Sequence, residues 1–197
     1  NFLRGSISLC KRLGSDKFGF HAGFFINMKV NEIGGSISKD SLFNQKESIN
    51  RFCGAFKLLQ NEFKEIDLYV ENNVFSKTNW INYNGENPFM MTSYKEYQLL
   101  REQIDFNLLL DVAHLKVSSK TLNLNWESEF YNMMSHSDYI HISDNDGLHD
   151  LNNRIDNSVD LLQLLDESDT ENKTFTLEVY SDIDSIKKSY NSLKLVI

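Results

Sequence analysis

The sequence is poor in three features: it has one proline, two cysteines and fewer basic than acidic residues. Two cysteines are too few for a disulfide framework. Cys10 and Cys53 both lie in stretches with helical spacing, so we expect two buried thiols in a reducing compartment. No apolar run approaches the ~20 residues that cross a bilayer, and the first residues lack the long apolar stretch of a signal peptide. The sequence therefore predicts a cytoplasmic protein without a membrane partner.

The charge balance also narrows the range of partners. Twenty Lys and Arg residues stand against 28 Asp and Glu residues, a formal net charge of −8 at pH 7. Such an acidic chain disfavours nucleic acid as a partner. The chain has 197 residues, of which 41% are hydrophobic, and this is enough for one buried core. We therefore expect one globular domain.

Short apolar runs alternate along the chain with longer stretches of helical spacing. We predict strands over 17–25, 66–70, 106–112, 139–142 and 175–179, and helices over 47–63, 93–103, 126–134, 159–165 and 184–195. The stretch 75–92, which holds the single proline, is predicted as one long loop. Strands that alternate with helices indicate parallel β-α units, and strands with consecutive apolar residues indicate a sheet covered on both faces.

Each predicted strand ends near a side chain that can bind a metal or a proton. In chain order these are His21, Glu71, Asp111, His141 and Glu178. A carboxylate buried in a covered sheet would be costly, but at the carboxyl-terminal mouth of a barrel it can meet a cation. Carboxylate oxygens and imidazole nitrogens together suit one divalent cation, such as Mn²⁺, Mg²⁺, Co²⁺ or Zn²⁺.

Less specific interpretations exist for each of these residues alone. A single acidic residue at a strand end is more often a helix N-cap or a solvated loop residue, and a lone histidine is more often a satisfied core residue. Four ligand types at successive strand ends favour a metal or catalytic cluster over chance. His149 and Asp150 lie in a polar loop and are equally compatible with either interpretation, whereas we expect His136 to be structural. Trp80 is the aromatic candidate for a substrate wall, because its loop leaves a strand end.

The motifs, taken in order, resemble one family. They are E-N at Glu71, D-x-x-H at Asp111 and His114, H-x-S-D-N-D-G from His141, and a final strand with Glu178. This order is similar to that of the xylose isomerase-like superfamily of β-α barrels. That superfamily includes sugar and sugar-phosphate isomerases and epimerases, and enzymes of the apurinic endonuclease type. The resemblance covers nearly the whole chain.

The resemblance implies a fold and a domain organisation. The fold is α/β, a TIM-type (β/α)8 barrel of which only the last five β-α units, strands 4–8, are apparent in this chain. The match of His21 to the end of the fourth strand implies a single barrel domain over 1–197 that lacks its three N-terminal units. A barrel of this type typically has about 250 residues.

The resemblance also implies roles for individual residues. The implied ligands of one divalent cation are Glu71, Asp111, His141 and Glu178. Glu71 and Glu178 would remove and return the proton next to a carbonyl group, with His114 orienting a substrate hydroxyl. His21 and Trp80 would contact the substrate.

The loop after His141 carries a further expectation and a departure. Asp144 or Asp146 would accept a hydrogen bond from the second ring nitrogen of His141, as partners of metal-ligating histidines do. The alternative is that 143–147 is simply a turn, because Asn-Asp-Gly favours turns. Where the family often has an Asp-x-His pair, this chain has Asp150-Leu151-Asn152, which removes a histidine that a three-metal endonuclease would need.

Three functions follow from the resemblance. The first is a metal-dependent isomerase or epimerase of a small-molecule sugar or sugar phosphate. The second is a metal phosphodiesterase of the apurinic endonuclease type. The third is a degenerate, non-catalytic barrel that binds sugars. The sequence leaves the metal, the sugar and a homo-oligomeric state open.

Overall fold

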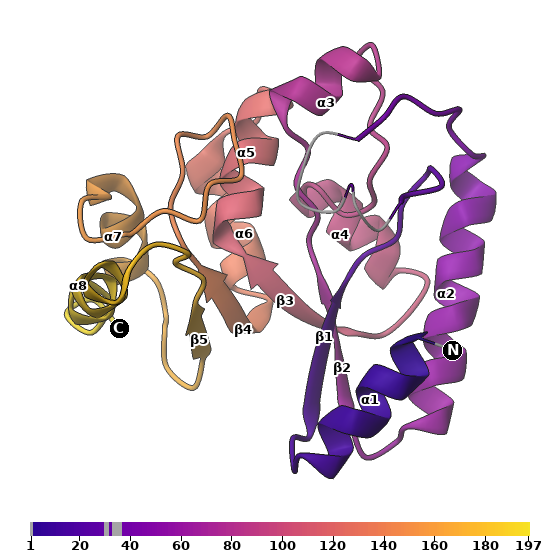
Figure 1. Cartoon of the computed structure of the whole chain (residues 1–197), viewed down its shortest axis with the longest axis horizontal. Helices are drawn as coiled ribbons and strands as arrows, with labels where there is room; N and C mark the ends of the chain where they lie inside the picture. The colour runs from indigo at the N-terminus through magenta and orange to yellow at the C-terminus, as the bar shows by residue number, and fades with distance from the viewer. Residues whose placement is uncertain (1, 30–31, 33–36) are drawn as a thin grey trace.

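The computed structural model describes residues 2–29, 32 and 37–197. Its centre is a five-stranded parallel sheet in the order β1-β2-β3-β4-β5 (Figure 1). The strands are β1 (Lys17–His21), β2 (Asp67–Glu71), β3 (Asn107–Asp111), β4 (Ser137–Ile142) and β5 (Thr174–Leu177). The helices are α1 (Phe2–Arg12), α2 (Gln45–Glu62), α3 (Lys77–Asn82), α4 (Tyr94–Arg101), α5 (Val112–Thr121), α6 (Trp126–Met134), α7 (Val159–Asp166) and α8 (Ile183–Leu193). All five strands of the sheet correspond to predicted strands.

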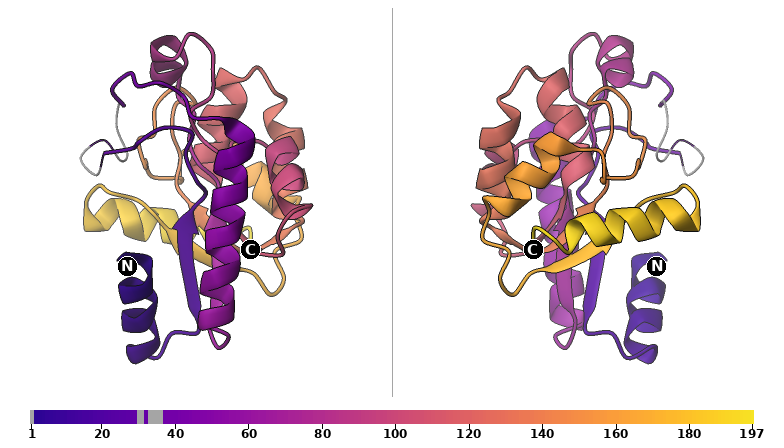
Figure 2. Two further views of the ribbon diagram at one scale, coloured as in Figure 1. Left: turned by 90° about the vertical axis from the view of Figure 1, so that its right-hand side faces the viewer. Right: turned by 90° about the vertical axis from the view of Figure 1, so that its left-hand side faces the viewer.

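The sheet curls into a half-barrel, with β1 and β5 at its two edges (Figure 1). Within the described residues each edge strand pairs with one neighbour, β1 with β2 and β5 with β4. Figure 2 shows α1 and α8 on one side of the molecule, away from α5 and α6. None of the described helices is long and apolar enough to cross a membrane. The predicted α/β class and partial barrel are thus confirmed.

The central strands β2 and β3 are buried along four consecutive residues, because both faces of the sheet are covered there, whereas the edge strands β1 and β5 are only partly buried. Leu108, Leu109 and Leu110 of β3 are all at most 2% exposed. In α2, helical spacing places Phe56 and Leu59 on the buried face, in the main core. This main core lies between the sheet and the helices that cover it.

The two thiols differ in burial. Cys53 is buried on α2, whereas Cys10 is only partly buried on α1, with its sulfur 3.2 Å from the carbonyl oxygen of Lys17. Both thiols are free, but the expectation of two buried thiols is correct for Cys53 alone. The reason is that α1 buries only Ile7 fully, so its other side chains stay near solvent.

The stretch 75–92 is not one loop, which corrects the prediction. It contains α3, whose N-cap Ser76 accepts a hydrogen bond from the Asn79 amide. Around this helix lies a second, smaller core that includes Ile26, Ile37, Phe75, Tyr83 and Phe89. The apolar residues of this stretch are too widely spaced to show helical periodicity, and they pack against the segment after β1. This small core forms one wall above the carboxyl ends of β1 and β2.

Candidate metal centre

The predicted ligand residues converge at the carboxyl ends of the strands. His21 of β1 is the register partner of Glu71 of β2, and Asp111 of β3 is that of His141 of β4. Glu178 directly follows β5, and its amide donates to the carbonyl oxygen of Ile142 at 3.0 Å. Parallel pairing therefore brings side chains from five separate segments to one level of the half-barrel.

His141 forms the centre of the cluster. Its Nδ1 atom lies 3.2 Å from Oε1 of Glu71 and 3.1 Å from Oε1 of Glu178. Ligand-type atoms of Glu71, Asp111 and His141 all lie within 4.8 Å of one another. The structure therefore brings the four residues proposed as metal ligands into one group.

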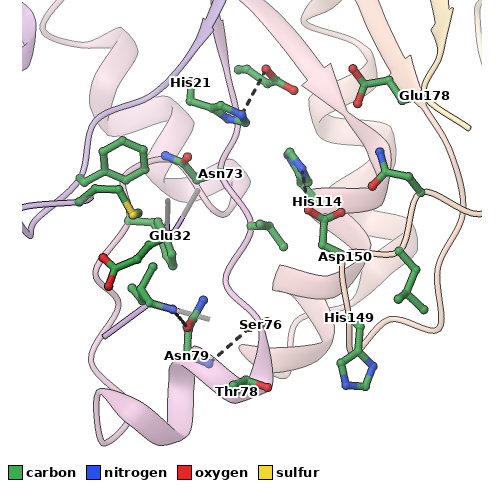
Figure 3. A pocket seen from close by; sticks show the side chains of 18 of the residues that line it. His21, Glu32, Asn73, Ser76, Thr78, Asn79, His114, His149, Asp150 and Glu178 are labelled. Carbon is green, nitrogen blue, oxygen red and sulfur yellow. Dashed lines mark hydrogen bonds and ion pairs between the residues drawn. The ribbon is translucent and has the colours of Figure 1, made fainter. Parts of the chain in front are cut away.

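A second group overlaps the first through Glu71. Ligand-type atoms of His21, Glu71 and His114 also lie within 4.8 Å of one another. The other carboxylate oxygen of Glu71, Oε2, lies 3.8 Å from Nε2 of His21. His114 is held at both ends: Nδ1 donates to the carbonyl oxygen of Asn72 at 3.0 Å, and Nε2 lies 3.4 Å from Oδ2 of Asp150 (Figure 3). Glu71 thus faces two different histidines with its two oxygens.

Asp111 is fixed by its place between a strand and a helix. It is the last residue of β3 and the N-cap of α5, and its Oδ1 accepts the amide of His114 at 2.7 Å. The side chain of Asn72 bonds the backbone of Asp111 twice. Its Oδ1 accepts the Asp111 amide at 2.7 Å, and its Nδ2 donates to the Asp111 carbonyl oxygen at 2.9 Å. Asp111 is therefore both the N-cap of α5 and a member of the cluster.

The electrostatics of the cluster favour a bound cation. Burial raises the pKa of Asp111 and of Glu178, although nearby histidines oppose both shifts. Burial also acts on Glu71, but the hydrogen bond from His141 and the nearby histidines keep its pKa below the usual value. Burial opposes protonation of His114, yet the carboxylates of Asp111 and Asp150 raise its pKa. Three clustered carboxylates thus depend on nearby positive charge to stay ionised.

The donor set fits a divalent cation. Three carboxylates and one imidazole provide the oxygen and nitrogen ligands of Mg²⁺, Mn²⁺ or Zn²⁺ sites. Nearby, Oδ1 of Asp150 is buried and has no hydrogen-bond partner in the structure. A buried carboxylate oxygen without a partner is costly unless a cation or a ligand contacts it.

A cavity of about 560 Å³ opens onto the cluster (Figure 3). His21, Glu71, His114, Asp150 and Glu178 line its inner end. Its outer end lies against α3 and the segment after β1. This volume lies within the ~300–1,000 Å³ typical of small-molecule sites.

Trp80 does not belong to the residues that line this cavity. Its indole packs against Gly85 and the small core, and the ammonium of Lys77 lies 3.6 Å from the ring centre. The residue lies on α3, which the prediction of a loop did not anticipate. The structure therefore places Trp80 in a wall behind the cavity rather than at its surface.

Asp144 and Asp146 are not brought to His141. Asp144 pairs with Lys116 at 2.6 Å, and Asp146 pairs with Nδ1 of His149 at 2.8 Å. The segment turns at Gly147, which has a φ of +73°, and Oδ1 of Asp146 accepts the amide of His149. The hydrogen bonds of the described residues thus favour the turn interpretation. His141 instead contacts Glu71 and Glu178.

Of the three remaining residues that the sequence singled out, two line the cavity and one lies away from it. His149 and Asp150, which the sequence left open, both line the cavity, and Asp150 contacts His114. His136 lies elsewhere, against the rings of Tyr94 and Tyr97.

Two asparagines with no role assigned from the sequence hold the site together. Asn72 and Asn73 follow Glu71 directly, and both are buried. The amide of Asn73 donates to the carbonyl oxygens of Ala22 at 3.1 Å, Gly23 at 3.3 Å and Met90 at 2.8 Å. A polar pair immediately after an apolar strand is the signal that could have identified them.

Removing the Asn73 side chain should destabilise the protein. Asn73→Ala removes the side-chain donor from the buried carbonyl oxygens of Ala22 and Met90, so we expect the free energy of unfolding to fall by about 2–3 kcal/mol. The measurement is urea denaturation, with Asn132→Ala at a partly exposed position of α6 as the matched control. Equal stability of the two variants would contradict this role.

No family model and no curated protein matches the sequence. Several solved structures are similar to it. The TTHB071 protein from Thermus thermophilus, soaked with ZnCl2, is 17% identical with a TM-score of 0.56, over 96% of this chain and 66% of that chain. The 3-keto-D-glucoside 4-epimerase YcjR from E. coli is 12% identical with a TM-score of 0.58, and the match covers 95% of this chain and 65% of that chain. A D-psicose 3-epimerase, in the presence of D-fructose, is 10% identical with a TM-score of 0.56, and the match covers 99% of this chain and 66% of that chain.

These likenesses define the class of the fold. At 10–17% identity they show the fold alone: the chain shares its parallel β-α half-barrel with these structures, in agreement with the predicted partial barrel. It spans 65–66% of the length of these neighbours.

Proposed function

We propose that the protein is a metal-dependent sugar isomerase or epimerase that transfers a proton next to a carbonyl group. The observation that carries the proposal is the placement of Glu71 and Glu178 on either side of His141, both at the inner end of the cavity. An epimerase needs a base and an acid that reach one carbon from two sides. These two carboxylates come from opposite parts of the half-barrel, β2 and the segment after β5.

The residues of the cluster have separate tasks in this proposal. Glu71, Asp111, His141 and Glu178 hold the cation, which when bound would polarise a substrate carbonyl. Glu71 and Glu178 take and return the proton. His114, fixed between Asn72 and Asp150, orients a substrate hydroxyl. His21 lines the same wall and contacts the substrate from the β1 side.

The experiment is deuterium exchange, with the protein in its full natural length. The protein is incubated in D₂O with free ketoses and ketose phosphates, and incorporation is measured by mass spectrometry. We expect exchange that stops with a chelator and returns with a divalent cation. A metal-loaded protein that shows no chelator-sensitive exchange on any sugar would contradict the proposal.

The phosphodiesterase remains the second candidate because of one observation. The group of His21, Glu71 and His114 could hold a cation beside the first, and enzymes that cleave phosphate esters often use two. Chelator-sensitive cleavage of an oligonucleotide with an abasic site, without exchange on any ketose, would favour this candidate. Absence of both activities with metal bound would favour a non-catalytic sugar-binding barrel.

We also propose that three further β-α units complete the barrel. Two observations support this. The edge strands β1 and β5 each have one described partner, and the flanking helices expose large apolar side chains. Phe2 on α1 is 85% exposed, and Ile183 on α8 is 62% exposed. Additional strands between β5 and β1 would pair both edges.

A further inference from the structure

Two polar groups in the wall of the cavity have no hydrogen-bond partner in the described part of the chain. One is Oδ1 of Asp150, which is buried, while Oδ2 of the same carboxylate faces Nε2 of His114 (Figure 3). The other is the side-chain amide of Asn152, a residue that is only 9% exposed and that lines the cavity. Buried polar groups are normally paired, so two unpaired groups at neighbouring positions of one cavity indicate a ligand.

The backbone of Asn152 has an uncommon conformation. Its φ of +45° lies in the left-handed region, which residues other than glycine rarely adopt. Its carbonyl oxygen accepts the amide of Tyr180, two residues after Glu178, at 3.3 Å. Such strained positions are held by their surroundings and cluster at functional sites. Here the contact ties Asn152 to the segment that carries Glu178.

The loop that carries both residues is closed on itself and anchored. The backbones of Asp144 and Asn153 are joined by two hydrogen bonds, at 2.7 and 3.0 Å, which close the loop 144–153. The side-chain amide of Asn145 donates to the carbonyl oxygen of Ala113 in α5 at 2.9 Å. A loop that is fixed in this way can bind a ligand with little further cost of ordering.

The two groups together match a hydroxyl group. The carboxylate oxygen of Asp150 accepts a hydrogen bond, and the amide nitrogen of Asn152 donates one. A hydroxyl group can donate to the first and accept from the second at the same time. An anionic oxygen has no hydrogen to donate, so it would leave Oδ1 of Asp150 unpaired.

We propose that Asp150 and Asn152 form a subsite that binds one hydroxyl group of the substrate, close to the carbon that reacts. This inference rests on the proposed function and adds two substrate-contacting residues to it. The place of the subsite follows from its neighbours, because Asp150 contacts His114 and Asn152 is bonded to the segment after Glu178. A hydroxyl group held there fixes which carbon of the sugar lies between Glu71 and Glu178.

The test removes the amide and the hydroxyl group separately and then together, in the full natural protein. Asn152→Gly deletes the amide and keeps the positive φ, which glycine adopts without strain. Asn123→Gly is the matched control, because Asn123 has a φ of +56°, is exposed and lies outside the cavity. The parent substrate is the ketose that exchanges fastest in a panel that includes D-fructose and D-tagatose. Its mono-deoxy analogues each lack one hydroxyl group, and kcat/KM is measured for chelator-sensitive deuterium exchange.

We expect Asn152→Gly to lower kcat/KM on the parent ketose by about tenfold. One mono-deoxy analogue should be a poorer substrate for the natural protein by at least about tenfold, because the subsite is left unpaired. On that analogue the variant and the natural protein should agree within about twofold, since the partner of the amide is already absent. Asn123→Gly should match the natural protein on every substrate.

The outcomes separate the inference from the function on which it rests. A variant that exchanges at the rate of Asn123→Gly overturns the inference, and so does a loss that is the same on the parent and on every analogue. Loss of one bound Mn²⁺ ion in Asn152→Gly, measured by titration, would assign the pair to a cation and also overturn it. These results leave the proposed function intact. Absence of chelator-sensitive exchange on every ketose, with metal bound, overturns the proposed function and the inference together.

Discussion

Glu178→Gln should lower the rate of deuterium exchange into a ketose by about 10²–10⁴-fold, the usual contribution of a positioned acid or base. Glutamine keeps the size of the side chain, and its amide oxygen can still coordinate a cation. It cannot take or return a proton. We therefore expect kcat to fall much more than the affinity for the metal. The measurements are exchange kinetics at saturating ketose and a titration with Mn²⁺.

The control for this variant is Glu171→Gln. Glu171 is exposed in the turn before β5, at the opposite end of the same strand, so the change removes one charge without touching the cavity. We expect unchanged exchange. A Glu178→Gln variant that binds metal and exchanges at the rate of the control would remove Glu178 from the proton transfer.

Asp111→Asn should weaken binding of a divalent cation by at least about 100-fold. Even changes in residues that only support metal ligands cost ~10–100-fold. Asparagine is as good an N-cap as aspartate, so α5 keeps the bond from the His114 amide. Burial raises the pKa of Asp111, which means that its ionised form is unfavourable in the folded protein. Against the effect of burial, the Asp111 charge also raises the pKa of His114, so the change removes both an unfavourable buried charge and a favourable partner of that histidine. Because the cap is kept, we expect the stability measured with chelator to change little.

This combination of results separates a ligand from a helix cap. The matched control is Asn125→Ala, which removes the cap of α6, where Oδ1 accepts the Ser128 amide at 2.7 Å. We expect that variant to lose about 1 kcal/mol of stability and no metal affinity. If Asp111→Asn bound metal as tightly as the natural protein, Asp111 would be a cap alone.

The sequence predicted the sheet and the convergence of the cluster for a physical reason. Parallel strands end at the same edge, so a ligand type at each strand end predicts a cluster before any distance is known. Glu71 and Asp111 follow runs of consecutive apolar residues, which indicate buried strands without ambiguity. Register then places them beside His21 and His141.

Other features could not be predicted because tertiary contacts create them. Helix α5 begins directly at the end of β3, and its residues are buried on several sides, so its apolar pattern merges with that of the strand. Trp80 was assigned to the cavity because its loop leaves a strand end. Its direction is set by α3 and the small core. The partners of Asp144 and Asp146 likewise depend on where Lys116 and His149 lie in space.

A crystal structure of the full natural protein grown with Mn²⁺, with an anomalous difference map, tests the central claim most directly. The account predicts one strong peak bonded by Glu71, Asp111, His141 and Glu178, at roughly 2.0–2.3 Å from their oxygen and nitrogen atoms. A peak held by other residues, or no peak at this cluster at saturating Mn²⁺, would contradict the assignment of the metal centre and the reaction proposed for it.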